Sequence, residues 1–197
     1  MTLSPRFEQA LTYASIVHAG QMRKASFVPY LSHLLSVTGL VLEYGGDEEE
    51  AIAALLHDAV EDAGGQGRLA DIRQRFGDRV AEIVLGCTDT DTTPKPPWQA
   101  RKEAYIAHLE QVSSSARFVS CCDKLHNCRS IIGDLRLVGD EVWKKFAGKR
   151  DGTLWYYTTL LTEYQRLDVC QPLVDELART VQTMQSLADS ISSGFVG

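Results

Sequence analysis

Long apolar runs are missing from this sequence. Hydrophobic residues make up 44% of its 197 residues, yet no stretch approaches the ~20 consecutive apolar residues that a membrane-spanning helix needs. Arg6, Glu8 and Gln9 follow closely behind Met1, which is not the pattern of an apolar secretory leader. We therefore expect a cytoplasmic protein with no membrane partner.

Basic charge and paired cysteines are also scarce. The chain has 20 Lys and Arg residues against 26 Asp and Glu residues, a net charge of -6, which disfavours nucleic acids and anionic membranes as partners. Its cysteines number five and form no C-x-x-C pair. Reduced, mostly buried thiols are therefore expected in place of a disulfide framework or a cysteine zinc site. Any anionic ligand must be held by a local basic cluster.

Alternating strand patterns, glycine-rich phosphate loops and internal repeats are absent as well. Apolar residues instead recur at helical spacing, and the length fits one domain. The sequence predicts an all-α fold of about ten helices. These are expected over residues 5–17, 31–44, 48–63, 69–76, 78–87, 98–109, 117–132, 134–143, 153–167 and 172–188. Three prolines predict a loop over residues 88–97.

The last expected helix carries an apolar stripe along one face. Its members are Leu173, Leu177, Val181, Met184 and Ala188. We expect this helix and the tail after it, residues 171–197, to pack on the domain formed by residues 1–170. A second copy of the chain is the other partner open to the stripe, which leaves a homo-oligomer as an alternative.

The stretch over residues 51–63, AIAALLHDAVEDA, is apolar on nearly every side. It contains four groups that bind metals or carry protons: His57, Asp58, Glu61 and Asp62. In a continuous helix, residues four apart share a face, so His57 is expected beneath Glu61 and Asp58 beneath Asp62. Unpaired buried charges would cost several kcal/mol each, which favours a divalent cation as their partner. The alternative is a helix end with a solvated acidic tail and one core histidine.

Two further candidate ligands lie outside that stretch. His33 stands near the start of an apolar helix, where a histidine is commonly a hydrogen-bonded core residue. Asp123 lies in a small, apolar turn with Asn127 one turn further along, and a salt bridge or helix cap is the alternative to metal ligation there. Two imidazoles and two carboxylates around one ion would suit Mn²⁺, Fe²⁺, Zn²⁺ or Mg²⁺.

Four motifs containing these residues occur in a recognisable order. They are Gly20-Gln-x-Arg-Lys24, Pro29-Tyr-x-x-His33, Ala53-Ala-Leu-Leu-His-Asp-x-Val-Glu-Asp62 and Asp123-Lys-Leu-His-Asn127. The H…HD…D order resembles the HD-domain metal-dependent phosphohydrolases. The complete set resembles more closely the hydrolase domain of RelA/SpoT-type alarmone enzymes and their single-domain relatives, the small alarmone hydrolases that include the metazoan SpoT homologue. The resemblance covers about residues 5 to 165, and the chain is too short for the synthetase domain of the long members.

The resemblance implies a reaction and a role for each matching residue. The implied reaction removes the 3′-pyrophosphate from ppGpp or pppGpp, a small-molecule nucleotide, leaving GDP or GTP and pyrophosphate. Mn²⁺ or another divalent cation is assigned to His33, His57, Asp58 and Asp123, and proton transfer to Glu61 and Asp62. Substrate contacts are assigned to Arg23 and Lys24 at the guanine, Asn127 near the metal and ribose, and Lys95 at phosphate, with Arg101, Lys102 and Arg150 as further phosphate candidates.

The sequence departs from the family pattern in two places. The loop over residues 88–97 is longer and richer in proline, and the family aromatic after Arg150 cannot be assigned among Trp155, Tyr156 and Tyr157. His18 and His126 lie in matching stretches and are expected to pack or to support the ligands. Since both departures touch the phosphate and sugar side, two alternatives remain. One is the same fold acting on ppApp, NADPH or nucleoside 5′-monophosphates, and the other is a nucleotide sensor without turnover.

Overall fold

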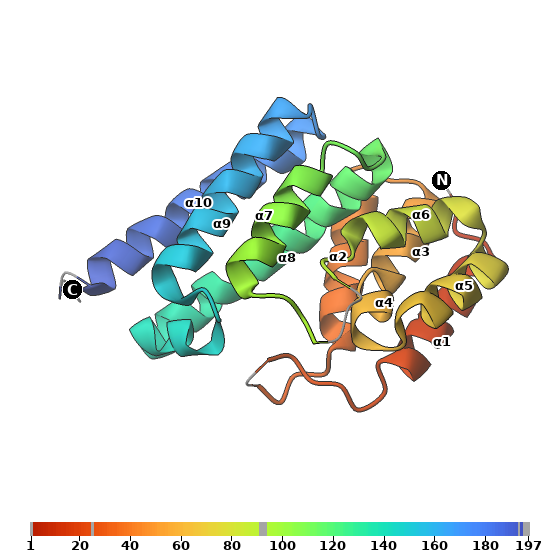
Figure 1. Cartoon of the computed structure of the whole chain (residues 1–197), viewed down its shortest axis with the longest axis horizontal. Coiled ribbons are helices and arrows are strands. Elements are labelled where there is room, and N and C mark those ends of the chain that lie inside the picture. The colour runs from red at the N-terminus through yellow and green to blue at the C-terminus, as the bar shows by residue number, and fades with distance from the viewer. Residues whose placement is uncertain (1, 25, 91–93, 193, 195–197) are drawn as a thin grey trace.

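The computed structural model describes residues 2–24, 26–90, 94–192 and 194. Within these ranges the chain forms ten α-helices and one 3-10 helix and no strand, apart from an isolated bridge between Met22 and Pro29 (Figure 1). The helices are α1 Pro5–Val17, α2 Leu31–Glu43, α3 Glu48–Leu56, α4 Ala59–Asp62, α5 Gly65–Phe76, α6 Asp78–Cys87, α7 Trp98–His108, α8 Ser114–Val138, η1 Gly139–Lys145, α9 Lys149–Arg166 and α10 Gln171–Ser192. The predicted all-α class is confirmed. None of the described helices is long and apolar enough to span a membrane.

Several helices begin where polar side chains can satisfy their first amide groups. The Ser4 side chain accepts the amide of Arg6 at the start of α1. Asp47 and Glu50 exchange hydrogen bonds with each other's amides at the start of α3. Because the first four amide groups of a helix have no partner within it, such caps fix the residue at which each helix begins.

The continuous helix predicted over residues 48–63 is wrong. α3 ends at Leu56, and α4 is a separate short turn. Nδ1 of His57 lies 2.8 Å from the carbonyl oxygen of Ala54, the oxygen that the Asp58 amide would use in a continuous helix. The imidazole takes the place of that backbone donor, so the chain turns at this point. Asp58 becomes the N-cap of α4, and its carbonyl accepts the amide of Asp62 at 3.0 Å, so these two residues remain one turn apart.

The two helices predicted over residues 117–132 and 134–143 are also wrong, because α8 continues through Gly133 to Val138. A glycine inside a helix costs about 1 kcal/mol relative to alanine. Ile131, Ile132 and Leu135 beside it are buried, and their packing offsets that cost. The 25 residues of α8 give it a length of roughly 37 Å. Only the following turn, η1, is 3-10.

α8 lies between two groups of helices (Figure 1). It packs against α2, α3 and α6 on one side and against α9 and α10 on the other. The apolar stripe of α10 is buried within this chain. All five cysteines are free thiols, and four of them are buried. Because α8 contacts both groups, side chains along its length can face a space between them.

Candidate metal centre and active site

Four candidate ligands converge from three segments: α2, the break between α3 and α4, and α8. Nε2 of His33 lies 3.1 Å from Oδ1 of Asp123 and 3.6 Å from Oδ2 of Asp58. Nε2 of His57 lies 2.9 Å from Oδ2 of Asp58 and 3.7 Å from Oδ1 of Asp123. Ligand atoms about 2.1 Å from one ion are roughly 3.0 to 3.5 Å apart at neighbouring positions. The spacing therefore suits a single ion.

Each of the two imidazoles has one ring nitrogen that faces the space between the four candidate ligands. Nε2 of His33 and Nε2 of His57 are buried without a hydrogen-bond partner among the described residues. Nδ1 of His57 donates to the Ala54 carbonyl, so Nε2 is the ring nitrogen that would bind a metal. An unsatisfied buried polar atom costs about 1 to 3 kcal/mol. A divalent cation would satisfy both atoms, so these residues fit a metal.

Other side chains orient the ligands. The Tyr30 hydroxyl donates to Oδ2 of Asp58, and burial, followed by the charge of Asp58, raises the pKa of Tyr30 far above its usual value, so the phenol keeps its proton. Nδ1 of His126 lies 2.7 Å from Nδ1 of His33. Burial and the neighbouring His33 lower the pKa of His126 to about 4, so neutral His126 can accept the proton of His33. Such partners fix the orientation of ligands around a metal.

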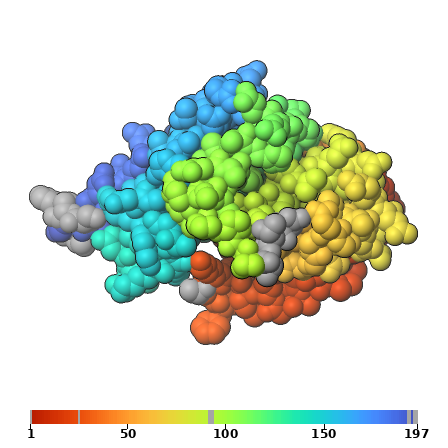
Figure 2. Space-filling model, in the orientation of Figure 1, coloured from red at the N-terminus to blue at the C-terminus, as the bar shows by residue number. Residues whose placement is uncertain are grey.

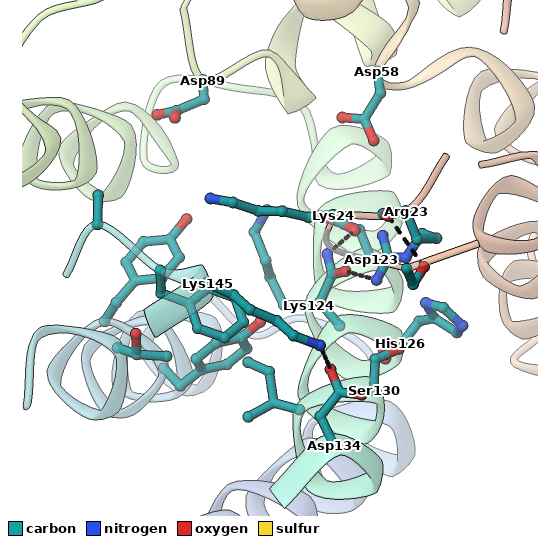
Figure 3. Close-up of a pocket in the computed structure, with 18 of the residues that line it drawn as sticks. Arg23, Lys24, Asp58, Asp89, Asp123, Lys124, His126, Ser130, Asp134 and Lys145 are labelled. Carbon is teal, nitrogen blue, oxygen red and sulfur yellow. Dashed lines mark hydrogen bonds and ion pairs between the residues drawn. The ribbon is translucent and has the colours of Figure 1, made fainter. Parts of the chain in front are cut away.

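Asp123 is held by two residues of its own helix (Figure 3). Nζ of Lys124 lies 2.6 Å from its Oδ2, and the amide of Asn127 donates to its Oδ1. The Asn127 oxygen in turn accepts Nη2 of Arg23 at 2.9 Å. Burial alone would raise the pKa of Asp123, but Lys124 and the two histidines hold it well below its usual range. The carboxylate therefore stays ionised.

The charges within the cluster shift the pKa of the other ligands as well. Burial alone would lower the pKa of His57, yet Asp58 and Asp123 raise it well above its usual value. Burial alone would raise the pKa of Asp58, and His57 and His33 hold it well below its usual value. Without a metal, the negative charges of Asp58 and Asp123 favour a proton on His57. A bound cation would neutralise those charges instead.

Glu61 and Asp62 leave α4 in different directions. Glu61 lines the cavity described below and lies 2.7 Å from Nζ of Lys95. Asp62 accepts the side-chain amide of Gln21 at 2.8 Å, and the Gln21 oxygen lies 2.7 Å from Nδ1 of His18. His18, expected to pack or support, is buried and stacks on the ring of Tyr30. Glu61 is thus the member of the pair that faces the ligand space.

A cavity of about 730 Å³ adjoins the four ligands. The segment between α1 and α2, α7 and the region around η1 surround the hollow seen in Figure 2. Eight predicted site residues line it: Arg23, Lys24, Asp58, Glu61, Arg101, Lys102, Asp123 and Asn127. His33 and His57 are buried behind this wall and do not line the cavity themselves.

Some predicted contacts lie differently from expectation. Arg150 does not line the cavity, and its guanidinium pairs with Asp151 at 2.9 Å and with Asp189 of α10 at 2.5 Å. Arg101 and Lys102 do line it, and both bind Asp89. Residues 91–93 of the proline-rich loop are outside the described ranges. Of the predicted phosphate contacts, Arg101 and Lys102 of α7 line the cavity.

The three aromatic residues after Arg150 lie differently with respect to the cavity. Tyr156 and Tyr157 line the cavity, whereas Trp155 does not. Nζ of Lys102 lies 4.8 Å from the centre of the Tyr156 ring, a cation–π distance. Tyr156 is accordingly the aromatic residue that is directly linked to the basic wall.

Four residues of the site were missed from the sequence. Tyr30 and Lys124 lie inside the quoted motifs, each close in sequence to a ligand, and that proximity was the available signal. Asp89 follows an apolar helix and is one of several acidic residues in its loop, and no feature of the sequence around it distinguishes it from the others. Lys145 reaches the far end of the cavity, and only the full length of α8 could have indicated it.

Comparison with known proteins gives consistent results. Residues 10–154 match the HD domain family. The chain is 35% identical over 140 residues to the guanosine-3′,5′-bis(diphosphate) 3′-pyrophosphohydrolase MESH1 of Xenopus tropicalis, covering 70% of this chain and 73% of the relative. For the Drosophila melanogaster MESH1 the identity is 33% over 131 residues, covering 65% and 70%.

A solved structure extends the similarity to the C-terminal helices. It belongs to a metazoan orthologue of SpoT that hydrolyses ppGpp and plays a role in starvation responses. It superposes with a TM-score of 0.67 and 27% identity, covering 98% of this chain and 97% of that one. The family match contains all four candidate ligands, and HD-domain hydrolases use a divalent metal. The chain therefore belongs to the HD-domain family of metal-dependent hydrolases, together with the metazoan MESH1 proteins.

Proposed function

We propose that this protein removes the 3′-pyrophosphate from guanosine alarmones, converting ppGpp to GDP and pppGpp to GTP. One observation carries the proposal: two unpartnered imidazole nitrogens and two carboxylates meet at the end of a cavity with a basic wall. The curated relatives named for this reaction support the choice of substrate.

His33, His57, Asp58 and Asp123 would hold the metal, and we infer Mn²⁺. Two imidazole nitrogens and two carboxylate oxygens combine borderline and hard donors, a set that Mn²⁺ accepts. When bound, such an ion lowers the pKa of water to near ~7 and neutralises charge on phosphate oxygens.

Glu61 and Asp62 would divide the proton transfers between them. Water attacks the phosphorus bonded to the ribose 3′ oxygen, and the bond from that phosphorus to the 3′ oxygen breaks. Glu61, which faces the cavity beside Lys95, takes the proton of the attacking water. Asp62, held by Gln21, orients the water or directs a proton to the 3′ oxygen. The water oxygen leaves with pyrophosphate.

The basic wall would neutralise the phosphates. Arg101, Lys102 and Lys124 line the cavity. Burial, followed by the charge of Lys124, lowers the pKa of Lys102, so an approaching anion would favour its charged form. Cations fixed in advance around the reacting groups stabilise charge that develops during the reaction. Asn127 and Arg23, which also line the cavity and bond each other, would contact the ribose and the base.

Turnover of a nucleotide panel by the manganese-loaded protein tests this function. The panel contains ppGpp, ppApp, NADPH and nucleoside 5′-monophosphates, with products identified by chromatography. We expect ppGpp to give GDP and pyrophosphate in equal amounts. Turnover of NADPH or monophosphates with both alarmones inert would overturn the substrate, and no turnover of any member with metal bound would favour a sensor.

A further inference from the structure

One face of α8 runs along the cavity. Asp123, Asn127, Ser130 and Asp134 all line it, and spacings of four, seven and eleven residues return to nearly the same face of a helix. Eleven residues at 1.5 Å each place Asp134 about 16 Å from Asp123 along the axis. A nucleotide held by its 3′-diphosphate at the metal end would extend along this face toward Asp134. The two ends of this face can therefore meet the two ends of one ligand.

The cavity differs in charge between these ends. The metal ligands and the basic wall lie near Asp123. At the far end an ion pair joins Nζ of Lys145 to Oδ2 of Asp134 at 3.0 Å (Figure 3). A carboxylate repels phosphate, so the far end is unsuited to a phosphate chain. It offers an acceptor and a donor side by side.

Apolar side chains accompany that ion pair. Ile131 and Leu137 lie within one helical turn of Asp134, and Phe146 follows Lys145; all three line the cavity. Leu137 is 82% exposed, so this end is open and a ligand would cover it. A purine base is apolar on both faces and polar at its edges. At the far end, the apolar side chains could cover the faces of a base and the ion pair could bind its polar edge.

We propose that Asp134 and Lys145 recognise the Watson–Crick edge of guanine; this assignment rests on the proposed function. Guanine presents N1–H and its 2-amino group as adjacent donors, with O6 as the neighbouring acceptor. The Asp134 carboxylate accepts the two N–H groups, and the Lys145 ammonium donates to O6. Both bonds involve a charged partner and are stronger than neutral ones.

Adenine would meet the same pair in the wrong order. Its 6-amino group faces the Lys145 ammonium, and its N1 acceptor faces the Asp134 carboxylate. Unpaired polar groups at a binding site lower affinity strongly. Hypoxanthine, the base of inosine, keeps N1–H and O6 and lacks only the 2-amino group. Inosine nucleotides therefore isolate a single hydrogen bond to Asp134.

Binding of GDP and IDP to the manganese-loaded protein, measured by calorimetry, tests this assignment without turnover. We expect the wild type to bind GDP about 10-fold more tightly than IDP. Asp134→Leu removes the acceptor, so its two affinities should agree within about twofold. Lys145→Met removes the O6 donor, which both ligands need, so it should weaken both by about 10-fold and preserve their ratio.

Lys144→Met is the matched control. It removes the neighbouring ion pair of η1, in which Lys144 lies 2.6 Å from Glu141 with both side chains largely exposed. This variant should change neither affinity. Asp134→Asn, which keeps the shape of the side chain, replaces Asp134→Leu if the leucine variant does not fold, and its preference for GDP should fall as well.

The two proposals fail in different ways. An unchanged GDP to IDP ratio in a folded Asp134 variant would overturn the base assignment, even where ppGpp is hydrolysed normally. A ratio that collapses as expected, in a protein that leaves ppGpp intact, would support the base assignment and overturn the proposed reaction.

Discussion

The metal end and the far end of the cavity are built in different ways. Around the metal, His33 and His57 are buried and have fixed partners behind them. At the far end, Asp134 and Lys145 have side chains that are 38% and 21% exposed, and they come from the end of α8 and from η1. Buried ligands with several partners cannot move independently, whereas a partly exposed pair can exchange partners. The proposed chemistry thus depends on the rigid end and the choice of base on the adaptable one.

Removing a metal ligand should give the largest effect. Asp123→Ala deletes a carboxylate that lies within 3.1 Å of Nε2 of His33, so the protein should lose stoichiometric Mn²⁺ and at least about 10³-fold in kcat. Metal analysis and ppGpp turnover measure both losses. Because GDP has no 3′-phosphate, its preference over IDP should survive in this variant. Retention of one Mn²⁺ per chain would show that Asp123 is not a ligand.

The next largest effect should separate proton transfer from metal binding. Glu61→Gln keeps the size of the side chain and removes its basicity, so kcat should fall by about 10²-fold while KM and Mn²⁺ content stay near normal. Glu103→Gln, which changes a carboxylate paired with Gln99 on the surface of α7, is the matched control. A normal kcat for Glu61→Gln would return Glu61 to the role of a solvated helix end.

Acid should weaken metal binding at the metal end. The pKa of His57 is raised well above its usual value by Asp58 and Asp123, so in the metal-free protein its imidazole is protonated at pH 7. Mn²⁺ must displace that proton, and affinity should fall by about tenfold for each pH unit below the raised pKa. Calorimetry in buffers of different ionisation enthalpy should record about one proton released per ion at pH 7. Zero release would contradict the raised pKa.

Arg23 lies between the two ends and should give the smallest effect. Its guanidinium bonds Asn127 and lies 5.8 Å from the centre of the Tyr30 ring. Stacking on the base from this position would contribute roughly 1 to 2 kcal/mol, so Arg23→Ala should raise KM for ppGpp by about 5- to 30-fold. The preference over ppApp should shrink with no loss of Mn²⁺. Arg129→Ala, which removes an exposed pair with Glu176, should leave KM unchanged.

Much of the metal end was predictable because its residues lie in short local motifs. His33, His57, Asp58 and Asp123 were identified from their order and spacing, and the structure brings them together. The break after Leu56 was not predicted. The same apolar pattern continues through residues 51–63, and a side chain bonded to a backbone carbonyl leaves no trace in that pattern.

The far end was not predictable from local patterns. The two predicted helices end and begin on either side of Gly133, and only the burial of its neighbours shows why α8 continues. Ion pairs between residues far apart in the sequence cannot be predicted from local patterns either. Arg150 matched a phosphate contact, yet α10 supplies Asp189 as its partner, and no motif near Arg150 indicates this.

The candidate ligands come from α2, the α3–α4 break and α8, so a metal bound between these segments would affect the lifetime of the protein. An ion held by all three segments joins distant parts of the chain in the native state and has no comparable site in the unfolded one. Binding of this kind adds about 2.7 kcal/mol to folding stability when free metal exceeds its dissociation constant 100-fold. A change of that size alters the fraction of chains exposed to proteases. The supply of the bound metal would then influence how much of this protein a cell retains.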